Sequence, residues 1–249
     1  MDFAKDRLVS LDVFRGATMA SMILVNNPGL WTAAYAPLLH VPWHGWTFTD
    51  LIFPSFLWIV GLAMTLSFAR RVARGENRSR LLLHAGRRAL ILFAVGLFLG
   101  GFPFFHLATL RIPGVLQRIA VCYLAAAAIF LFTRVRGQIA WTAALLAGYW
   151  ALLAWAPVPG HGAGKLEPVG NIAQHIDNLL LAGHMWSRTK VWDPEGILST
   201  IPAIATTLLG VLAGHILRAA KTASEKAAWL FTMGAALLAA GSVDRKSVV

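Results

Sequence analysis

The chain has 249 residues, of which 57% are hydrophobic and only 13% are charged, whereas a soluble domain carries about 25% charged residues. Together with a mean hydropathy of +0.64, this composition excludes an ordinary water-soluble fold. The net charge of +11 arises from 22 Lys and Arg against 11 Asp and Glu, and in a membrane protein such an excess marks cytoplasmic loops, so nucleic acid is not an expected partner.

A helix needs roughly 20 mostly apolar residues to cross the hydrocarbon core of a membrane. Seven stretches meet this requirement in chain order, of which the last is short: Leu11–Trp31, Phe48–Ala69, Ala89–Phe105, Gly114–Phe132, Ile139–Ala156, Ile197–Leu217 and Ala227–Ala240. The sequence therefore predicts an all-α, polytopic membrane helix bundle with seven transmembrane helices. The first stretch contains two charges and lacks a cleavage site, so we expect a span and not a removable signal.

Basic residues are distributed unevenly between the loops, and short cytoplasmic loops are usually rich in Lys and Arg. The loops on the side of the N-terminus hold Lys5, Arg7, Arg70, Arg71, Arg74, Arg78, Arg80, Arg87, Arg88, Arg134, Arg136, Arg218, Lys221 and Lys226. The opposite loops hold only Arg111, Lys165, Arg188 and Lys190. We therefore expect a multi-pass membrane protein with a cytoplasmic N-terminus and a long extracytoplasmic loop over residues 157–196.

Four charged residues lie within or at the ends of apolar stretches, namely Asp12, Arg15, Asp50 and Arg118. A charge at the centre of a spanning helix costs about 2.5–3.5 kcal/mol on insertion scales, so such residues usually face a cavity or one another. Asp12 and Arg15 are three residues apart and share one face of a helix. They predict either a structural ion pair between helices or part of a transmembrane site.

A polar and aromatic strip begins at His40 and leads directly into the second span at Asp50. Asp50 could orient an imidazole and set its tautomer, or it could cap the start of the helix. Trp43 could anchor the chain at the membrane surface or provide a platform for a sugar ring. His40 and His44 have helical metal-ligand spacing, but a proline lies between them and no Glu-x-x-His follows, so we expect no metal site.

Two further groups of polar residues stand at the starts of later spans. Gln117 and Arg118 are predicted to lie about one turn inside the fourth span, where a guanidinium suits a carbonyl, carboxylate or phosphate ligand. Asp193 and Glu195 precede the sixth span, where they could serve the helix start or hold an amine or the hydroxyl groups of a sugar. Glycine-rich phosphate loops and Gly-x-Ser-x-Gly are absent from the sequence.

These motifs, taken in order, resemble the heparan-alpha-glucosaminide N-acetyltransferase family of membrane acetyltransferases. The resemblance is carried by Arg7-Leu-Val-Ser-Leu-Asp-Val-Phe-Arg-Gly16, Leu24-Val-Asn-Asn27, the strip from His40 to Pro54, Arg111-Ile-Pro-Gly-Val-Leu-Gln-Arg118 and Trp192-Asp-Pro-Glu-Gly-Ile-Leu-Ser-Thr-Ile201. It implies transfer of an acetyl group from cytoplasmic acetyl-CoA to the amino group of a glucosamine-type sugar across the membrane. The active-site histidine of the family aligns with His40 and not with His44.

The resemblance also implies roles for individual residues. His40 would act as general base or as acetyl acceptor, and Asp50 would support it. Acetyl-CoA, the expected co-substrate, would meet Asp12, Arg15, Asn26, Gln117 and Arg118. The sugar would meet Trp43, Asp193 and Glu195. The inner arginines would hold the anionic end of CoA. The competing hypothesis is a sugar or amino-sugar permease, whose intramembrane charges line a translocation path.

The resemblance extends to the length of the chain. Relatives have more spans, so we expect residues 1–243 to be the N-terminal part of a longer membrane acyltransferase domain. One codon choice for Asp244–Val249 spells a common sequencing adapter, which predicts a non-native tail. The expected partners are the lipid bilayer, acetyl-CoA and the amino-sugar acceptor, and a homodimer is one assembly open to the chain.

Overall fold

The computed structural model describes residues 8–243, and the regular elements within them are helices. The α-helices are α1 (Val9–Asn26), α2 (Phe48–Ala73), α3 (Arg78–Gly101), α4 (Val115–Phe132), α5 (Val135–Trp155), α6 (Ile172–Leu181), α7 (Thr200–Arg218) and α8 (Ala223–Val243). Short 3-10 helices are η1 (Trp31–Ala33), η2 (Ala36–Leu38) and η3 (Leu107–Thr109). The predicted all-α class is confirmed. The tail Asp244–Val249 lies outside the described residues.

Among the described residues, five helices are long and apolar enough to cross a membrane, namely α2, α3, α4, α5 and α7. The first and last predicted spans also form helices, α1 and α8, but they are not among these five. Helix α1 has the same length as α4, 18 residues, but Asp12 and Arg15 lower its mean hydropathy. The polytopic helical architecture is therefore confirmed, whereas the total of seven spans stays a prediction.

Several helix boundaries differ from those expected from hydropathy. Helix α1 ends at Asn26 and not at Trp31, since Pro28 and Gly29 interrupt it. Helix α3 begins at Arg78, well before the apolar stretch, because its charged first turns are helical too and Asn77 caps them through a bond from Ser79 N (2.8 Å). Hydropathy detects the part of a helix that lipid would surround, not its polar extensions.

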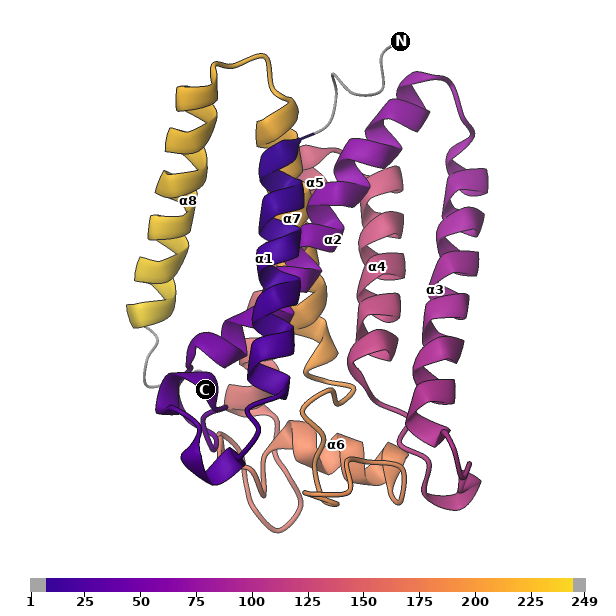
Figure 1. Ribbon diagram of the computed structural model, residues 1–249, viewed down its shortest axis with the longest axis vertical. Helices are drawn as coiled ribbons and strands as arrows, with labels where there is room; N and C mark the ends of the chain where they lie inside the picture. Colours follow the sequence, from indigo (N-terminus) through magenta and orange to yellow (C-terminus); the bar gives the residue numbers. More distant parts are fainter. Residues whose placement is uncertain (1–7, 244–249) are drawn as a thin grey trace.

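The centre of the bundle is formed by α2, α4 and α7, with α3 against α4, α5 against α7 and α1 against α2 (Figure 1). Helices α2 and α7 approach closely because each contributes a glycine at the crossing. A methyl group on Gly61 would lie 1.9 Å from Thr207 O, and one on Gly210 would lie 2.0 Å from Trp58 O. The buried Thr65 hydroxyl donates to Val211 O at 3.2 Å. Small residues and a hydroxyl thus join the two helices, as is common in membranes.

The loops assigned to one side by their low content of basic residues gather at one end of the bundle. Residues 27–47, residues 102–114 and the long segment carrying α6 lie together at the bottom of Figure 1, opposite the start of α1. Helix α6 was not predicted, because only ten residues form it within a loop. The grouping of loops agrees with the expected topology, while the side of the membrane stays a prediction.

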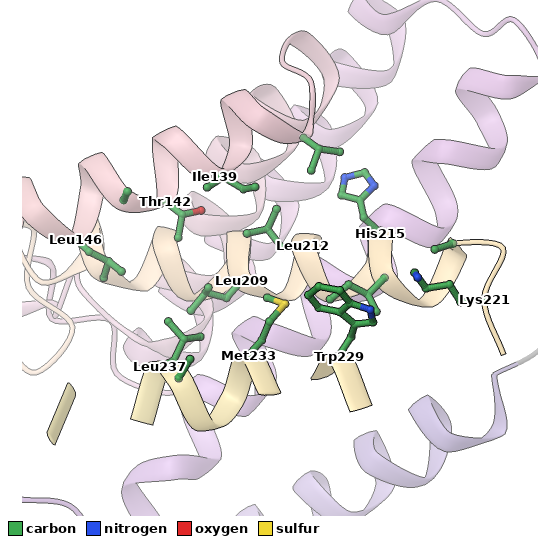
Figure 2. Close-up of a pocket in the computed structure, with 15 residues that line it drawn as sticks. Ile139, Thr142, Leu146, Leu209, Leu212, His215, Lys221, Trp229, Met233 and Leu237 are labelled. Atoms are coloured by element: carbon green, nitrogen blue, oxygen red, sulfur yellow. The ribbon is translucent and has the colours of Figure 1, made fainter. Parts of the chain in front are cut away.

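Helix α8 lies apart from the compact part of the bundle and contacts mainly α7. A groove of about 640 Å³ opens between α5, α7 and α8 (Figure 2). Many side chains of α8 are exposed, including Trp229 and Phe231. Exposed apolar surface of this kind is expected on a helix surrounded by lipid.

Candidate functional site

His40 and Asp50 are in direct contact at the loop end of α2. His40 Nδ1 lies 2.5 Å from Asp50 Oδ1, and the imidazole is 69% exposed. The other carboxylate oxygen, Oδ2, accepts from the backbone N of Thr47 at 2.9 Å and from its hydroxyl at 3.0 Å. Asp50 therefore does both things that the sequence left open, because it caps α2 and also contacts the imidazole.

This contact determines how the imidazole can react. An ionised carboxylate can only accept a hydrogen bond, so a neutral His40 donates from Nδ1 and keeps the lone pair on Nε2. Nε2 then points away from Asp50 as the atom that could take a proton or an acyl group. The family resemblance assigned Asp50 to His40, and the structure brings the two side chains into contact.

The strip between His40 and Asp50 is attached to the long loop at three points. Trp43 Nε1 donates to Leu166 O at 2.8 Å, and its ring meets that of Trp192 edge to face at 5.0 Å between centroids. His44 Nε2 lies 3.6 Å from Glu167 Oε1. His44 thus has a partner of its own, and Trp43 connects the strip to the segment that carries Asp193. Whether Trp43 also stacks on a sugar stays a prediction.

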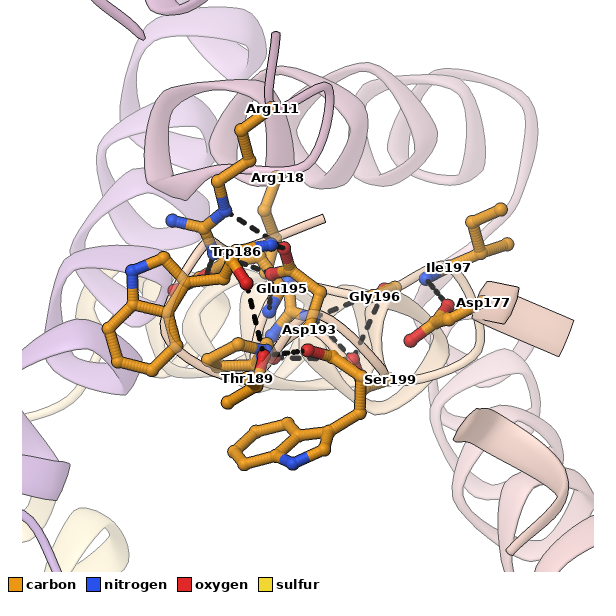
Figure 3. A network of polar contacts seen from close by, with 12 residues as sticks. Arg111, Arg118, Asp177, Trp186, Thr189, Asp193, Glu195, Gly196, Ile197 and Ser199 are labelled. Carbon is orange, nitrogen blue, oxygen red and sulfur yellow. Dashed lines mark hydrogen bonds and ion pairs between the residues drawn. The ribbon is translucent and has the colours of Figure 1, made fainter. Parts of the chain in front are cut away.

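A network of charges holds the segment before α7 (Figure 3). Arg111 donates from Nε to Asp193 Oδ2 at 2.8 Å and from Nη2 to Asp193 Oδ1 at 2.5 Å, and Nη2 also contacts Glu195. Asp193 further accepts from the backbone N of Trp186 and of Glu195. Its side chain is completely buried. The carboxylate of Asp193 is thus committed to organising this segment, and its predicted contact with a sugar stays untested.

The electrostatics of Asp193 follow from these contacts. Burial alone raises the pKa of an aspartate, but the hydrogen bonds from Arg111 and from two backbone N–H groups outweigh it and hold the pKa of Asp193 below its usual value. The same contacts raise the pKa of Arg111, although burial opposes this. No role in the site was predicted for Arg111 from the sequence, although Arg111 begins one of the motifs. Its partner Asp193 lies 82 residues away along the chain, so their pairing was not predictable from spacing.

A cavity of about 300 Å³ lies beside this network and is lined by Gln117, Arg118 and Glu195, among others. Arg118 Nη2 donates to Gly196 O at 3.2 Å and contacts the Ser199 hydroxyl. Arg118 Nε is buried and has no hydrogen-bond partner among the described residues. Three predicted site residues are therefore brought together, with a guanidinium that retains a free donor.

Asp177 is a buried carboxylate that the sequence reasoning missed. It stands on α6 and accepts from the backbone N of Ile197 at 2.9 Å (Figure 3). Burial raises the pKa of Asp177, and the nearby charge of Asp193 adds to this, against the hydrogen bond from Ile197. Gly196 makes room for it, because a methyl group there would lie 2.0 Å from Asp177 Oδ2. The only feature of the sequence that could have indicated Asp177 was an acidic residue within a short amphipathic segment.

The remaining predicted site residues lie apart from this cavity. Asp12 and Arg15 pair with each other within α1, with Arg15 Nη1 3.4 Å from Asp12 Oδ1, near the end of α1 opposite the loops, whereas the sequence predicted an ion pair between helices or part of a transmembrane site. Asn26 is exposed at the other end of α1, about 21 Å along the axis from Asp12. The five residues expected to meet acetyl-CoA therefore fall into separate groups, with Gln117 and Arg118 at the cavity.

Comparisons with known proteins agree with these motifs. Residues 7–242 match the family described as heparan-alpha-glucosaminide N-acetyltransferase, catalytic. The chain is 33% identical over 285 aligned positions to heparan-alpha-glucosaminide N-acetyltransferase of Homo sapiens, with 95% of this chain and 42% of the human protein covered. It is 33% identical over 260 positions to the Mus musculus protein of that name, covering 85% and 39%. The chain thus spans about two fifths of these curated relatives.

Proposed function

The chain belongs to the heparan-alpha-glucosaminide N-acetyltransferase family, and we propose that it transfers an acetyl group from acetyl-CoA to the amino group of a glucosamine-type sugar. In our proposal the donor arrives from the cytoplasmic side of a bacterial cell membrane and the acceptor from the opposite side. The observation that carries this proposal is the contact of His40 Nδ1 with Asp50 Oδ1, which leaves Nε2 available as a base.

In the direct route, the acetyl group passes from the thioester to the amine in a single displacement. The sugar nitrogen attacks the thioester carbonyl, the carbon–sulfur bond breaks, and the electron pair leaves with the CoA thiolate. His40 Nε2 takes the proton from the nitrogen and passes it to the thiolate, while Asp50 stabilises the imidazolium formed in between. If Nε2 attacks first, the carbon–sulfur bond breaks, the CoA thiolate leaves and an acetyl-imidazole forms. The sugar amine then attacks the acetyl carbonyl, the carbon–Nε2 bond breaks, and the liberated imidazole takes the proton from the nitrogen.

We also propose that the Arg118 cavity receives the acyl end of the donor. The buried Nε of Arg118 has no partner among the described residues, and a carbonyl oxygen that gains negative charge would provide one. Phe53 of α2 connects this cavity to the His40 region, since its ring lies 6.0 Å from the Arg118 guanidinium and it stands one turn after Asp50. A homodimer stays a prediction.

The test is transfer across a sealed membrane. The full chain is placed in vesicles with acetyl-labelled acetyl-CoA inside and glucosamine outside, and labelled N-acetylglucosamine is measured for wild type, His40→Ala and His44→Ala. We expect product with wild type and His44→Ala, and a loss of about 10²-fold or more with His40→Ala. Undiminished product with His40→Ala would exclude the role of His40. Uptake of glucosamine without acetylation would favour a permease instead.

The two routes of transfer can be separated in the same preparation. Acetyl-labelled donor is mixed with the protein without sugar, and the protein is then analysed for label by mass spectrometry. A stable mass increase on the peptide containing His40, absent in His40→Ala, identifies the acetyl-imidazole. Transfer without any labelled peptide on the turnover time scale identifies direct attack by the sugar amine.

A further inference from the structure

The groove between α5, α7 and α8 is separate from the site proposed for acetyl transfer. Its walls are largely aliphatic, with Ile139 and Leu146 on α5, Leu209 on α7 and Met233 and Leu237 on α8 (Figure 2). Its volume of about 640 Å³ lies within the range of small-molecule sites. Because the lining is apolar and belongs to helices of the membrane bundle, its occupant should be a hydrocarbon chain.

The depth of the groove indicates which kind of hydrocarbon fits. Its lining on α5 extends from Val135 to Leu146, which is about 16 Å along the helix axis. This is close to half of the hydrocarbon core, which is about 30 Å thick. A spanning helix would need the full thickness, whereas a lipid acyl chain occupies one leaflet. The groove therefore has the depth of a single acyl chain.

One end of the groove is basic. Lys221 belongs to its lining, and Lys221 Nζ lies 5.9 Å from the centre of the ring of Trp229, another lining residue. Arg218 ends α7 nearby, and Val135 stands between Arg134 and Arg136 in the sequence. Glu225 is the acidic residue in the first turn of α8, and its carboxylate accepts hydrogen bonds from the backbone N and the hydroxyl of Thr222.

We propose that this groove binds one acyl chain of an anionic phospholipid, with the lipid phosphate held by Lys221 and Arg218. Basic pockets between membrane helices favour anionic headgroups because the positive charges lie where the headgroup meets water. Lys221 supplies a charge at the opening, and the aliphatic walls supply the rest of the site. The lipid also fills the space between α7 and α8, which contact each other only sparsely, and so stabilises the position of α8.

The proposal is tested by lipid binding to the full chain in detergent, with phosphatidylglycerol and phosphatidylcholine as the two probes. The readouts are lipid adducts in native mass spectrometry and the unfolding midpoint. We expect phosphatidylglycerol to bind more tightly, and each of Lys221→Gln and Arg218→Gln to weaken its binding about fivefold. Lys165→Gln, a lysine of the opposite loops, is the control and should leave binding unchanged.

A second pair of variants tests the groove without altering charge. Ala143→Phe places a ring inside the groove, while Ala144→Phe adds the same ring to a neighbouring exposed position of α5 outside the lining. We expect Ala143→Phe alone to abolish the preference for phosphatidylglycerol. Equal binding of both lipids by wild type, or an unchanged preference in Ala143→Phe, would overturn the proposal. If wild type shows no lipid preference and Ala143→Phe dissociates a dimer, the occupant is a second copy of the chain and the proposal is overturned.

Discussion

Asp50 contacts His40 with one carboxylate oxygen and caps α2 with the other, so the candidate base and the start of a membrane helix depend on the same side chain. The imidazole is therefore attached to the start of α2, a helix of the bundle centre, although the ring itself is exposed. A rigid carboxylate holding an accessible imidazole is a suitable arrangement for proton transfer.

Replacing Asp50 by asparagine should separate its contact with His40 from its capping of α2. Asparagine has one acceptor oxygen, so Asp50→Asn can cap α2 or accept from His40 but cannot do both. We expect acetyl transfer to fall about 10²-fold or more, while the free energy of unfolding falls by no more than about 1 kcal/mol. Vesicle transfer rates and thermal unfolding in detergent measure the two effects.

The matched control is Thr47→Ala, which removes the hydroxyl at the cap and leaves Asp50 and His40 in place. It should lower stability by about 1 kcal/mol with little loss of rate per folded molecule. Equal losses of rate in Thr47→Ala and Asp50→Asn would show that only the helix start matters.

Arg111 should be essential for the segment that precedes α7. Arg111→Met removes the cationic partner of Asp193, whose side chain is fully buried, and leaves its carboxylate with only the hydrogen bonds from backbone N–H groups. We expect a loss of roughly 3 kcal/mol, the lower end of the range for broken buried pairs, since Arg111 keeps part of its surface in water. Arg188→Met changes an exposed arginine of the segment between α6 and α7 and should change stability by less than about 0.5 kcal/mol. Similar effects of both would contradict the network.

The pH dependence of folding stability should show the contribution of Asp193. Folding lowers the pKa of Asp193, so the unfolded chain binds more protons just below the usual aspartate value of about 3.9. The stability that Asp193 contributes is present above that value and is lost as the pH falls through the folded pKa. Asp193→Asn should therefore be less stable than wild type at neutral pH and should lose less on acidification, as measured by unfolding midpoints across pH.

Asp177 should change folding stability with pH in the opposite direction to Asp193. Burial raises the pKa of Asp177, so the folded chain binds the extra proton and stability is lost as the pH rises from the usual value to the folded pKa. In Asp177→Asn this loss should disappear, because the amide oxygen can still accept from Ile197 N without carrying charge. A variant that loses stability at neutral pH as strongly as Asp193→Asn would contradict this sign.

The crossing of α2 and α7 should not tolerate a methyl group. In Gly61→Ala the new carbon would lie 1.9 Å from Thr207 O, a backbone atom that cannot move alone, so the helices must separate. We expect a loss of about 1–3 kcal/mol, measured by thermal unfolding in detergent. Gly148→Ala on α5 meets nothing within 4 Å and should be neutral or slightly stabilising. Equal stability of the two variants would refute the close crossing.

The order of elements was predictable because each apolar stretch is a local property of the chain. Helices form at all seven predicted stretches, and the errors lie at their ends and in α6, where hydropathy does not distinguish helix from loop. The contact of Asp12 with Arg15 was predictable from helical spacing, and that of His40 with Asp50 from their nearness in sequence. The family was also predictable from the sequence, because its motifs occur in order along the chain.

The sequence by itself determined that this is a helical membrane protein and which family it belongs to, and through that resemblance it predicted the candidate base, His40. Only the tertiary structure decided that Arg111 pairs with Asp193, that Arg118 keeps a free buried donor beside Glu195, and that Asp12 lies far from both. The physical reason is the separation along the chain over which each kind of interaction acts. Hydropathy and helical spacing act over one or two turns of chain, whereas the pairing of buried charges depends on packing between segments some 80 residues apart.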